Sequence, residues 1–350
     1  MISRKQYIIV NATSLDRSGA LSILRQFVES IPEDDRKWLV FISPSVKLHT
    51  CKKNIRIEQI VGVKQMFKRF WWDILGLKRW LKKNNIDPIS AVSLQNTGFN
   101  VGKRVPTYIY YHQPIPFYPF KWNPFNKDEK TFWFYKNIYP LFVRFSLNKD
   151  TQIFVQLEYI KKGFAERFNH DPNLISVYSP SVKLSLHSTN EAKEISNTIK
   201  LIYPAMPYFY KNHRVLKDAL ALTNRDLELI FTIEIEKDCI GDDRIRFIGS
   251  QPYESICNLY QVCDALLFPS YIETYGLPLL EAAMSGLPII AADLPYAREV
   301  LSGYDGVVYV PCDNPIAWAN AIQGIEKGKR FVPFDISSQP SWNELFNKIK

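Results

Sequence analysis

Short apolar runs rich in Val and Ile alternate with amphipathic stretches along most of the chain. This alternation is typical of βαβ units and predicts a mostly parallel sheet. In the first half we expect strands at residues 7–12, 38–43, 55–60, 89–94, 107–111 and 152–156, with helices beginning near 19, 65, 129 and 158. A second series opens at residue 200, with strands in LIYPA, LELIFTI, RIRFIG, DALLF, PIIAA and VVYV and helices near 213, 253, 277, 295 and 314.

The two series predict two domains, because 350 residues exceed the size at which one hydrophobic core usually keeps growing. A polar, Ser-rich stretch separates the series and places the boundary near Pro180. We therefore expect domains at 1–180 and 181–333, with residues 334–350 forming a last helix that Trp342 anchors on the N-terminal domain. The predicted class is α/β, with two Rossmann-like doubly wound domains that face each other across a ligand-binding cleft.

Composition describes a well-packed, soluble chain with 46% hydrophobic and 23% charged residues. Lys and Arg exceed Asp and Glu by nine (44 against 35), which suits an anionic partner such as phospholipid, nucleic acid or a diphosphate. The five cysteines form no CxxC pair and have no His at metal spacing, so we expect reduced thiols and no metal site. With neither a signal-peptide core nor a membrane-spanning apolar run, the sequence predicts a cytoplasmic protein.

The segment PSYIETYGLPLLEAAMSG carries two carboxylates, Glu273 and Glu281, and predicts a short helix after a polar loop. Pro278 suits the first helical position, residues 277–285 are good helix formers, and Gly286 suits the position just past the end. Glu281 would then lie in the first turn. The unpaired backbone N–H groups at the start of such a helix would offer an anion site to the cleft.

These residues lie in a stretch, RIRFIG to YAREVL, that resembles the C-terminal domain of family 4 glycosyltransferases, which are retaining enzymes with the GT-B fold. The family's E-x7-E motif reads ETYGLPLLE here and stands between the segments DALLFPS and GLPIIAAD. Similarity runs from about Leu201 to Ile322, and it is weaker in SLQNTG, YYHQPIPFY and FVQLEYIKKGF. The resemblance implies an acceptor-side N-terminal domain and a C-terminal domain that binds a nucleotide sugar.

The resemblance also implies a role for each matching residue. Backbone N–H groups of Gly276 and Leu277 would bind the donor diphosphate, and Lys211 would neutralise charge as the sugar–phosphate bond breaks. Glu281 would accept hydrogen bonds from the ribose hydroxyls, and Glu273 would contact hydroxyls of the donor sugar near the reacting carbon. No metal is expected, because the helix start and the basic side chain stabilise the leaving diphosphate.

One position departs from the family pattern. Many members carry an Arg about five residues before the Lys, where this chain has Met206 five residues before Lys211. Either Lys211 acts with backbone donors alone, or another basic residue such as Arg214 or Arg17 takes the place of the missing Arg.

The N-terminal half offers further candidates. Ser18 and Gly19 begin the helix after the first strand, where the family places a loop against the donor phosphates or the acceptor; the alternative is an ordinary strand-to-helix turn. His112 follows a predicted strand, and the resemblance favours a histidine that faces the cleft and helps to bind acceptor or donor sugar. We count it with the candidate catalytic residues Glu273 and Lys211, and a structural or solvated His112 is the alternative.

Residues 64–83 combine aromatic and basic side chains. On a helical wheel one face, which we expect to pack on the sheet, gathers Met66, Phe67, Phe70, Trp71, Ile74, Leu77 and Leu81. Trp72 and Leu75 fall among Lys and Arg on the outer face, which fits a peripheral contact with anionic lipid. The alternative is a plain domain helix with a solvated charged side.

Together these features predict a retaining, metal-independent hexosyltransferase that moves a sugar from a nucleotide-sugar donor to a glycan acceptor. The acceptor would be a lipid-linked glycan at the inner face of a membrane, in surface polysaccharide synthesis of the O-antigen or capsule type. Two alternatives stay open: a nucleotide-sugar- or glycan-binding protein without catalysis, and a nucleotide-sugar epimerase of the same fold. Nucleic acid is not an expected partner, because the basic residues are spread and form no recognised module.

Overall fold

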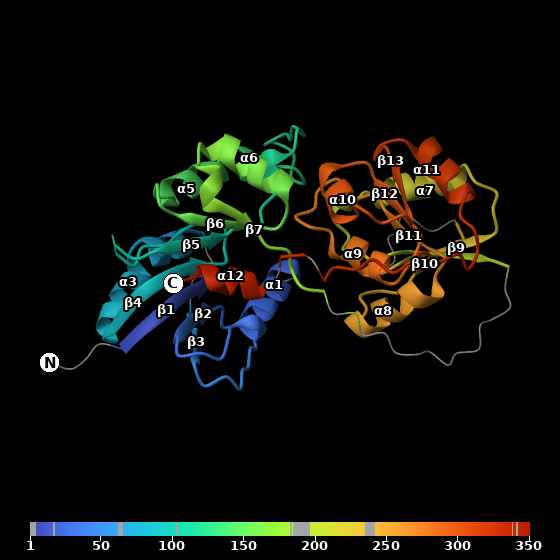
Figure 1. Cartoon of the computed structure of the whole chain (residues 1–350). Helices are drawn as coiled ribbons and strands as arrows, with labels where there is room; N and C mark the ends of the chain where they lie inside the picture. The colour runs from blue at the N-terminus through green and yellow to red at the C-terminus, as the bar shows by residue number, and fades with distance from the viewer. Residues whose placement is uncertain are drawn as a thin grey trace. The chain divides into compact units, whose positions relative to one another are not determined.

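The computed structural model describes residues 5–16, 18–61, 66–102, 104–182, 184, 197–234, 242–337, 339–340 and 342–350. The chain forms two compact units (Figure 1). The N-terminal unit comprises residues 1–181 and 339–350, and the C-terminal unit comprises 182–338. The division falls within two residues of the boundary that the Ser-rich stretch indicated, and residues 339–350 belong to the first unit.

The N-terminal unit is built on a seven-stranded parallel sheet with the order β3-β2-β1-β4-β5-β6-β7. Its strands are β1 (Lys5–Ala12), β2 (Trp38–Ile42), β3 (Ile55–Gln59), β4 (Ile86–Ser93), β5 (Thr107–Tyr110), β6 (Gln152–Val155) and β7 (Ile175–Val177). Its helices are α1 (Ser18–Ser30), α2 (Met66–Trp71), η1 (Trp72–Gly76), α3 (Leu77–Lys83), η2 (Ile115–Phe117), α4 (Lys130–Asn137), α5 (Tyr139–Ser146), α6 (Glu158–Phe168), η3 (Pro172–Leu174) and α12 (Trp342–Lys348). The strand order reverses direction between β1 and β4, which is the switch point of a doubly wound sheet.

Side chains of the central strands alternate between two hydrophobic cores, one on each face of this sheet. Ile8 and Val10 of β1 belong to the core that α1 and α12 cover, and Ile9 belongs to the core that α3 covers. Alternation of this kind follows from the period of two along a strand. Trp342 of α12 packs edge-on against Phe27 of α1, with ring centroids 5.8 Å apart.

The segment predicted as one helix over 64–83 is different in the structure. From Met66 it forms α2, a π-helical turn η1 and then α3, and residues 62–65 lie outside the described part. The predicted faces hold only in part: Leu77 and Leu81, expected on the sheet, are buried, and Leu75, expected on the outer face, is 41% exposed. Trp72 and Asp73 are buried, whereas Phe70, Trp71 and Ile74, which we expected on the sheet, are 48%, 51% and 40% exposed.

The C-terminal unit has a six-stranded parallel sheet with the order β10-β9-β8-β11-β12-β13. Its strands are β8 (Ile199–Tyr203), β9 (Leu227–Phe231), β10 (Ile245–Phe247), β11 (Ala265–Phe268), β12 (Ile289–Ala292) and β13 (Val307–Val310). Its helices are η4 (Phe209–Lys211), α7 (His213–Ala221), α8 (Tyr253–Val262), α9 (Leu277–Met284), α10 (Pro295–Val300) and α11 (Pro315–Gln323). Strands β8 and β11 are neighbours at the centre, so the loops after them meet at one edge.

Among the described residues, no helix has the length and apolar character needed to cross a membrane.

Candidate functional site

An ion pair joins the two loops that follow the central strands of the C-terminal unit. Lys211 ends the short helix η4 after β8, and Glu273 lies in the loop after β11. The Lys211 ammonium contacts the Glu273 carboxylate, and the two side chains are only 15% and 14% exposed. The ammonium also lies 5.5 Å from the ring centroid of Tyr210 and 5.9 Å from that of Phe268. The site therefore holds a cation and an anion that are largely withdrawn from water.

The backbone around Lys211 is fixed by residues on either side of it. The Tyr203 hydroxyl donates to the Lys211 carbonyl over 2.6 Å. Asn212 has a left-handed backbone (φ 56°), and its side-chain amide donates to the Cys312 carbonyl over 2.7 Å. Asn tolerates this conformation better than most residues. These bonds hold the chain where it turns from η4 into α7.

Helix α9 begins on the same loop as Glu273. Gly276 caps its start with a left-handed backbone (φ 88°), and a β-carbon there would lie 3.2 Å from the Leu279 side chain. Glycine is suited to this turn because it has no β-carbon. The first backbone N–H groups of α9, including that of Leu277, have no partners within the helix and carry partial positive charge. The turn therefore begins a helix on the loop that also carries Glu273, and anion binding by its N–H groups stays a prediction.

Glu281 lies one turn deeper in α9 than expected. The helix begins at Leu277, so Glu281 is its fifth residue and belongs to the second turn. It is buried and accepts a hydrogen bond of 2.9 Å from the Tyr260 hydroxyl of α8. Burial raises the pKa of Glu281 to about 7. The first-turn prediction was wrong because the left-handed Gly276 starts the helix one residue before Pro278.

Arg214, a proposed substitute for the missing arginine, lies on the surface of α7. Its side chain is 90% exposed, and its Nε lies 3.6 Å from Asp218 Oδ2 one turn further along. Arg17, the other proposed substitute, lies outside the described residues.

The candidates of the N-terminal unit occupy two places. Ser18 and Gly19 are the first residues of α1; a β-carbon on Gly19 would meet no atom within 4 Å, and the Ser18 side chain is outside the described part. His112 follows β5, and its Nε2 lies 2.9 Å from the Leu94 carbonyl oxygen. Its backbone N–H donates to Asn96 Oδ1 over 2.6 Å. Burial lowers the pKa of His112, which favours the neutral imidazole.

Sequence reasoning missed a cavity of about 1450 Å3 in the N-terminal unit. Ser18, Gly19 and His112 are not among its lining residues. Its polar lining includes Arg69 and Asp73, which the wheel over 64–83 did not single out. The one available signal was the polar segment SLQNTG directly after a buried strand. Among the described residues, no group of three or more His, Cys, Asp or Glu side chains could hold a metal ion.

Comparison with known proteins identifies the C-terminal half of the chain. Residues 190–332 match the family of glycosyl transferases group 1. These residues belong to that family. The O-antigen chain mannosyltransferase RfbU of Salmonella typhimurium is 28% identical over 176 residues, covering 48% of this chain and 49% of RfbU. The chain thus matches about half the length of this curated relative.

Solved structures extend the likeness to both units of the chain. Sucrose-phosphate synthase from Thermosynechococcus elongatus superposes with a TM-score of 0.66 at 15% identity, over 91% of this chain and 89% of the synthase. Alr3699/HepE from Anabaena, in complex with UDP and glucose, gives 0.64 at 16% identity over 91% and 89%. These likenesses confirm the predicted GT-B fold.

Proposed function

We propose that this protein transfers a sugar from a nucleotide-sugar donor to a glycan acceptor in surface polysaccharide synthesis. The observation that carries the proposal is the pair of Lys211 and Glu273 beside the start of α9, within the segment that belongs to the family. The relative RfbU, an O-antigen chain mannosyltransferase, supports a polysaccharide product. The bound UDP and glucose of Alr3699/HepE support a nucleotide-sugar donor.

The proposed chemistry begins with competition for Lys211. Without donor its ammonium is paired with Glu273. An incoming diphosphate would share that ammonium and accept hydrogen bonds from the N–H groups at the start of α9. Glu273 would then accept hydrogen bonds from the donor sugar. Fixed charges and dipoles in a partly dry site stabilise charge that develops on a leaving group more than water does.

The proposal includes retention and independence of metal. The bond between the anomeric carbon and the phosphate oxygen breaks, and the acceptor oxygen bonds to the same face of that carbon. The leaving phosphate oxygen, on that face, takes the proton of the acceptor hydroxyl. Lys211 and the α9 start supply positive charge for the diphosphate, which is the task that a divalent cation performs in other transferases.

The purified chain should first be assayed against a panel of nucleotide sugars for thermal shift and for release of nucleoside diphosphate. We expect one donor to raise the melting temperature and to be turned over equally well in EDTA. NMR of the product should show the anomeric configuration of the donor. Activity that disappears in EDTA and returns with magnesium or manganese would disprove metal independence.

Variants separate an enzyme from a binding protein. Lys211→Ala and Glu273→Gln should lower kcat about 100-fold or more, as loss of a charge-stabilising donor does. Arg246→Ala, which removes an exposed cation of β10 in the same unit, is the matched control and should keep its activity. Tight donor binding without turnover in the unaltered chain would favour the binding protein. A large fall in melting temperature of Lys211→Ala with unchanged turnover per folded molecule would contradict the role of Lys211.

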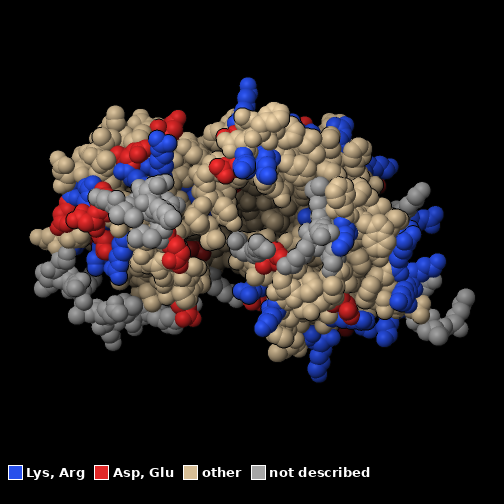
Figure 2. All heavy atoms as spheres, turned by 180° about the vertical axis from the view of Figure 1, so that it is seen from behind, with Lys and Arg blue, Asp and Glu red and all other residues tan. Residues whose placement is uncertain are grey.

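We also propose that the N-terminal unit touches an anionic membrane. Large apolar side chains of α2, η1 and α5 are exposed, and Phe70 meets Phe142 across α2 and α5 at 5.8 Å. The most exposed are Phe67 (80%) and Phe145 (86%). Lys68, Lys78, Arg79, Lys82 and Lys83 are exposed on the same helical segment. On the face drawn in Figure 2, Lys and Arg side chains gather along one edge of this unit. Apolar side chains among basic ones suit an anionic bilayer surface.

Sedimentation with vesicles tests this contact. The protein should bind vesicles that contain phosphatidylglycerol and should bind pure phosphatidylcholine weakly. Phe67→Ser combined with Phe145→Ser should reduce binding at least tenfold. Val308→Ser, at a 54% exposed position of the C-terminal unit, is the control. Equal binding of the double variant would overturn the assignment.

A further inference from the structure

The loop between β8 and α7 brings three aromatic residues directly before Lys211. Its sequence is PAMPYFYKN, and Met206 stands where the family pattern has an Arg. Tyr208 and Phe209 are each 47% exposed, as is Met206. Exposed apolar side chains that gather in one place mark binding sites more often than isolated ones do. Packing alone therefore does not account for this loop.

The rings of the loop stack and end on the Lys211 ammonium. Tyr208 and Tyr210 are nearly parallel, with an interplanar angle of 8° and ring centroids 5.4 Å apart. The ammonium lies 5.5 Å from the Tyr210 centroid and 5.9 Å from that of Phe268, the last residue of β11. The negative face of an aromatic ring attracts a cation within about 6 Å of its centroid. Lys211 therefore contacts two rings in addition to the Glu273 carboxylate.

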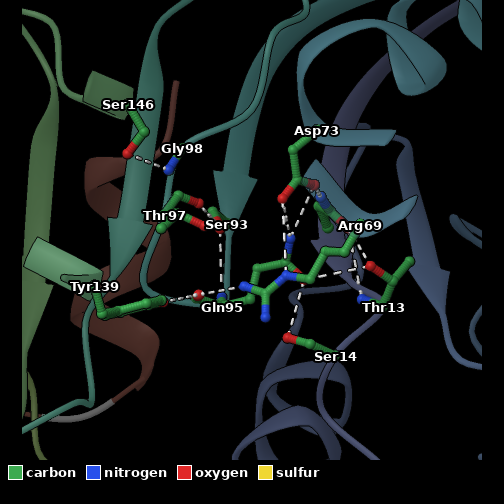
Figure 3. Close-up of polar contacts among 11 residues, drawn as sticks. Thr13, Ser14, Arg69, Asp73, Ser93, Gln95, Thr97, Gly98, Tyr139 and Ser146 are labelled. Carbon is green, nitrogen blue, oxygen red and sulfur yellow. Dashed lines mark hydrogen bonds and ion pairs between the residues drawn. The ribbon is translucent and has the colours of Figure 1, made fainter. Parts of the chain in front are cut away.

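A lysine needs such rings more than an arginine does, as Arg69 of the N-terminal unit illustrates (Figure 3). Arg69 Nε lies 3.8 Å from Asp73 Oδ2, and Arg69 Nη2 donates to the Gln95 carbonyl over 3.1 Å. Two contacts fix a guanidinium, because it is planar and its donors point in set directions. An ammonium is a compact charge on a flexible four-carbon stem, so one carboxylate leaves its position less defined. Rings packed against the ammonium restrict it further.

A ring also differs from Glu273 in its effect on an incoming diphosphate. The Glu273 carboxylate attracts the ammonium but repels a second anion. The Tyr210 ring attracts the ammonium and carries no net charge. Burial, with the Glu273 carboxylate as the second cause, raises the pKa of Tyr210, so its hydroxyl stays neutral. The ring therefore keeps its contact with Lys211 while a diphosphate replaces the carboxylate.

The backbone of η4 is held without the Tyr210 side chain. The Tyr271 N–H donates to the Tyr210 carbonyl over 2.7 Å, and the Ser270 hydroxyl donates to the same carbonyl over 3.4 Å. Both donors belong to the loop after β11, which also carries Glu273. These bonds use only the main chain of residue 210, so they remain when its side chain is changed. Substitution at position 210 therefore tests the ring separately from the loop.

We propose that Tyr210 is a positioning residue: its ring, backed by Tyr208, holds the Lys211 ammonium where the leaving diphosphate binds, in place of the Arg that is missing at Met206. The sequence suggested backbone donors or another basic residue for this task, and a pair of stacked rings is a third solution. The proposal rests on the proposed function for its diphosphate. The contact between ring and ammonium is independent of donor and of turnover.

Kinetics of side-chain variants test the ring, with the donor that the panel of nucleotide sugars identifies. Tyr210→Leu should lower kcat about tenfold and change KM little, because the ring acts on charge that develops in the transition state. Tyr210→Phe keeps the ring and should keep nearly all of the activity. Phe331→Leu is the matched control, because the Phe331 ring also lies 5.5 Å from a lysine ammonium, that of Lys329, in the segment after α11. It should keep its kcat, and an unchanged kcat of Tyr210→Leu would overturn the proposal.

Graded fluorination at position 210 separates attraction by the ring from packing. Phenylalanine with one, two or three ring fluorines has almost the size of Phe, but each fluorine weakens the negative face of the ring. We expect kcat to fall stepwise with the number of fluorines. The same kcat across the series would show that the ring only fills space, which contradicts the positioning role.

A measurement without donor keeps the outcome separate from that of the proposed function. Acetic anhydride acetylates lysines, and mass spectrometry compares Lys211 with the exposed Lys130 of α4 as the reference. Tyr210→Leu should raise the relative labelling of Lys211 about threefold, and Tyr210→Phe should leave it unchanged. If no nucleotide sugar is turned over, the fluorinated series is read by this labelling, and a stepwise rise sustains the ring contact while it counts against the transferase. Labelling of Lys211 that does not depend on residue 210 would overturn the contact, whatever the activity.

Discussion

Glu281 is a carboxylate whose protonation is tied to its burial. It lies in the interior of the C-terminal unit with the Tyr260 hydroxyl as partner, and burial raises its pKa to about 7. The folded chain therefore holds this proton more tightly than the unfolded chain, in which the pKa of the carboxyl group is 4.5. The loss of folding free energy that comes from burying the charge is fully present above the folded pKa of about 7. It falls as the pH drops and is gone below the unfolded pKa of 4.5.

Glu281→Gln should therefore stabilise the protein in a pH-dependent way. At pH 8 we expect the variant to melt about 2–4 °C higher than the unaltered chain, which corresponds to roughly 1 kcal/mol for a unit of this size. The difference should shrink towards pH 5, and use of the donor should fall if the carboxylate binds ribose. Glu254→Gln, at an exposed position of α8, is the control. A difference that grows as the pH falls would contradict the buried charge.

The functional residues differ in how far the sequence revealed them. Lys211 and Glu273 follow strands that periodicity places at the centre of a parallel sheet, so their meeting could be expected from topology. The hydrogen bond from Tyr260 to Glu281 could not be expected, because the position of Tyr260 in helix α8 does not indicate where its hydroxyl points. Asp73 was missed for a different reason, since it is a charged residue within an irregular turn of a segment that we interpreted as one regular helix.

At the scale of elements, strands were easier to predict than helix phase. The strands of both sheets lie where apolar runs occur, although the short strand β7 (Ile175–Val177) was not predicted. The segment 64–83 carries an apolar stripe at helical spacing, which a regular helix would bury. Phe67, Phe70 and Trp71 before the π-turn are exposed, whereas Leu77 and Leu81 after it are buried as a regular helix would place them. Hydrophobic periodicity carries no information about such a turn. The same stripe then lies partly on the surface.

The end of α9 offers a matched test of local packing. Gly286 and Gly328 both have left-handed backbones, with φ of 67° and 69°. A β-carbon on Gly286 would lie 2.4 Å from the Phe331 carbonyl oxygen, whereas one on Gly328 would meet no atom within 4 Å. Both alanine variants share the cost of about 1–2 kcal/mol for an L-residue in this conformation.

Gly286→Ala should therefore lose clearly more stability than Gly328→Ala, because the backbone of Phe331 must also move. Urea denaturation followed by tryptophan fluorescence measures both midpoints, and Trp318 of the C-terminal unit reports the change. Equal urea midpoints for the two variants would show that the backbone of Phe331 moves away from the added β-carbon without a measurable loss of stability.

At the scale of the whole molecule, the last helix belongs to the first unit. Leu345 and Phe346 of α12 are fully buried in the core that also holds Trp38 of β2. Arg36 donates to the carbonyls of Phe346 and Ile349, each over 2.9 Å. The N-terminal unit is therefore assembled from two stretches of chain that 157 residues of the C-terminal unit (182–338) separate in sequence.

A chain that stops after residue 338 should lose stability in the N-terminal unit alone. Removing a buried aromatic residue such as Trp342 costs about 3–5 kcal/mol by itself. We expect calorimetry to show one transition moved to lower temperature and a second, from the C-terminal unit, in its original place. A synthetic peptide of residues 339–350 should restore part of the loss. Unchanged melting of the truncated chain would contradict this role of α12.

This connectivity has a consequence for synthesis. A ribosome releases residues 182–338 before the final helix, so the C-terminal unit has its whole sequence available while the earlier unit still lacks α12. Domains generally fold as units in the order in which they emerge. Here the core around Phe27 and Trp38 can close only when residues 339–350 have left the exit tunnel. The unit that is translated first is therefore expected to finish folding last.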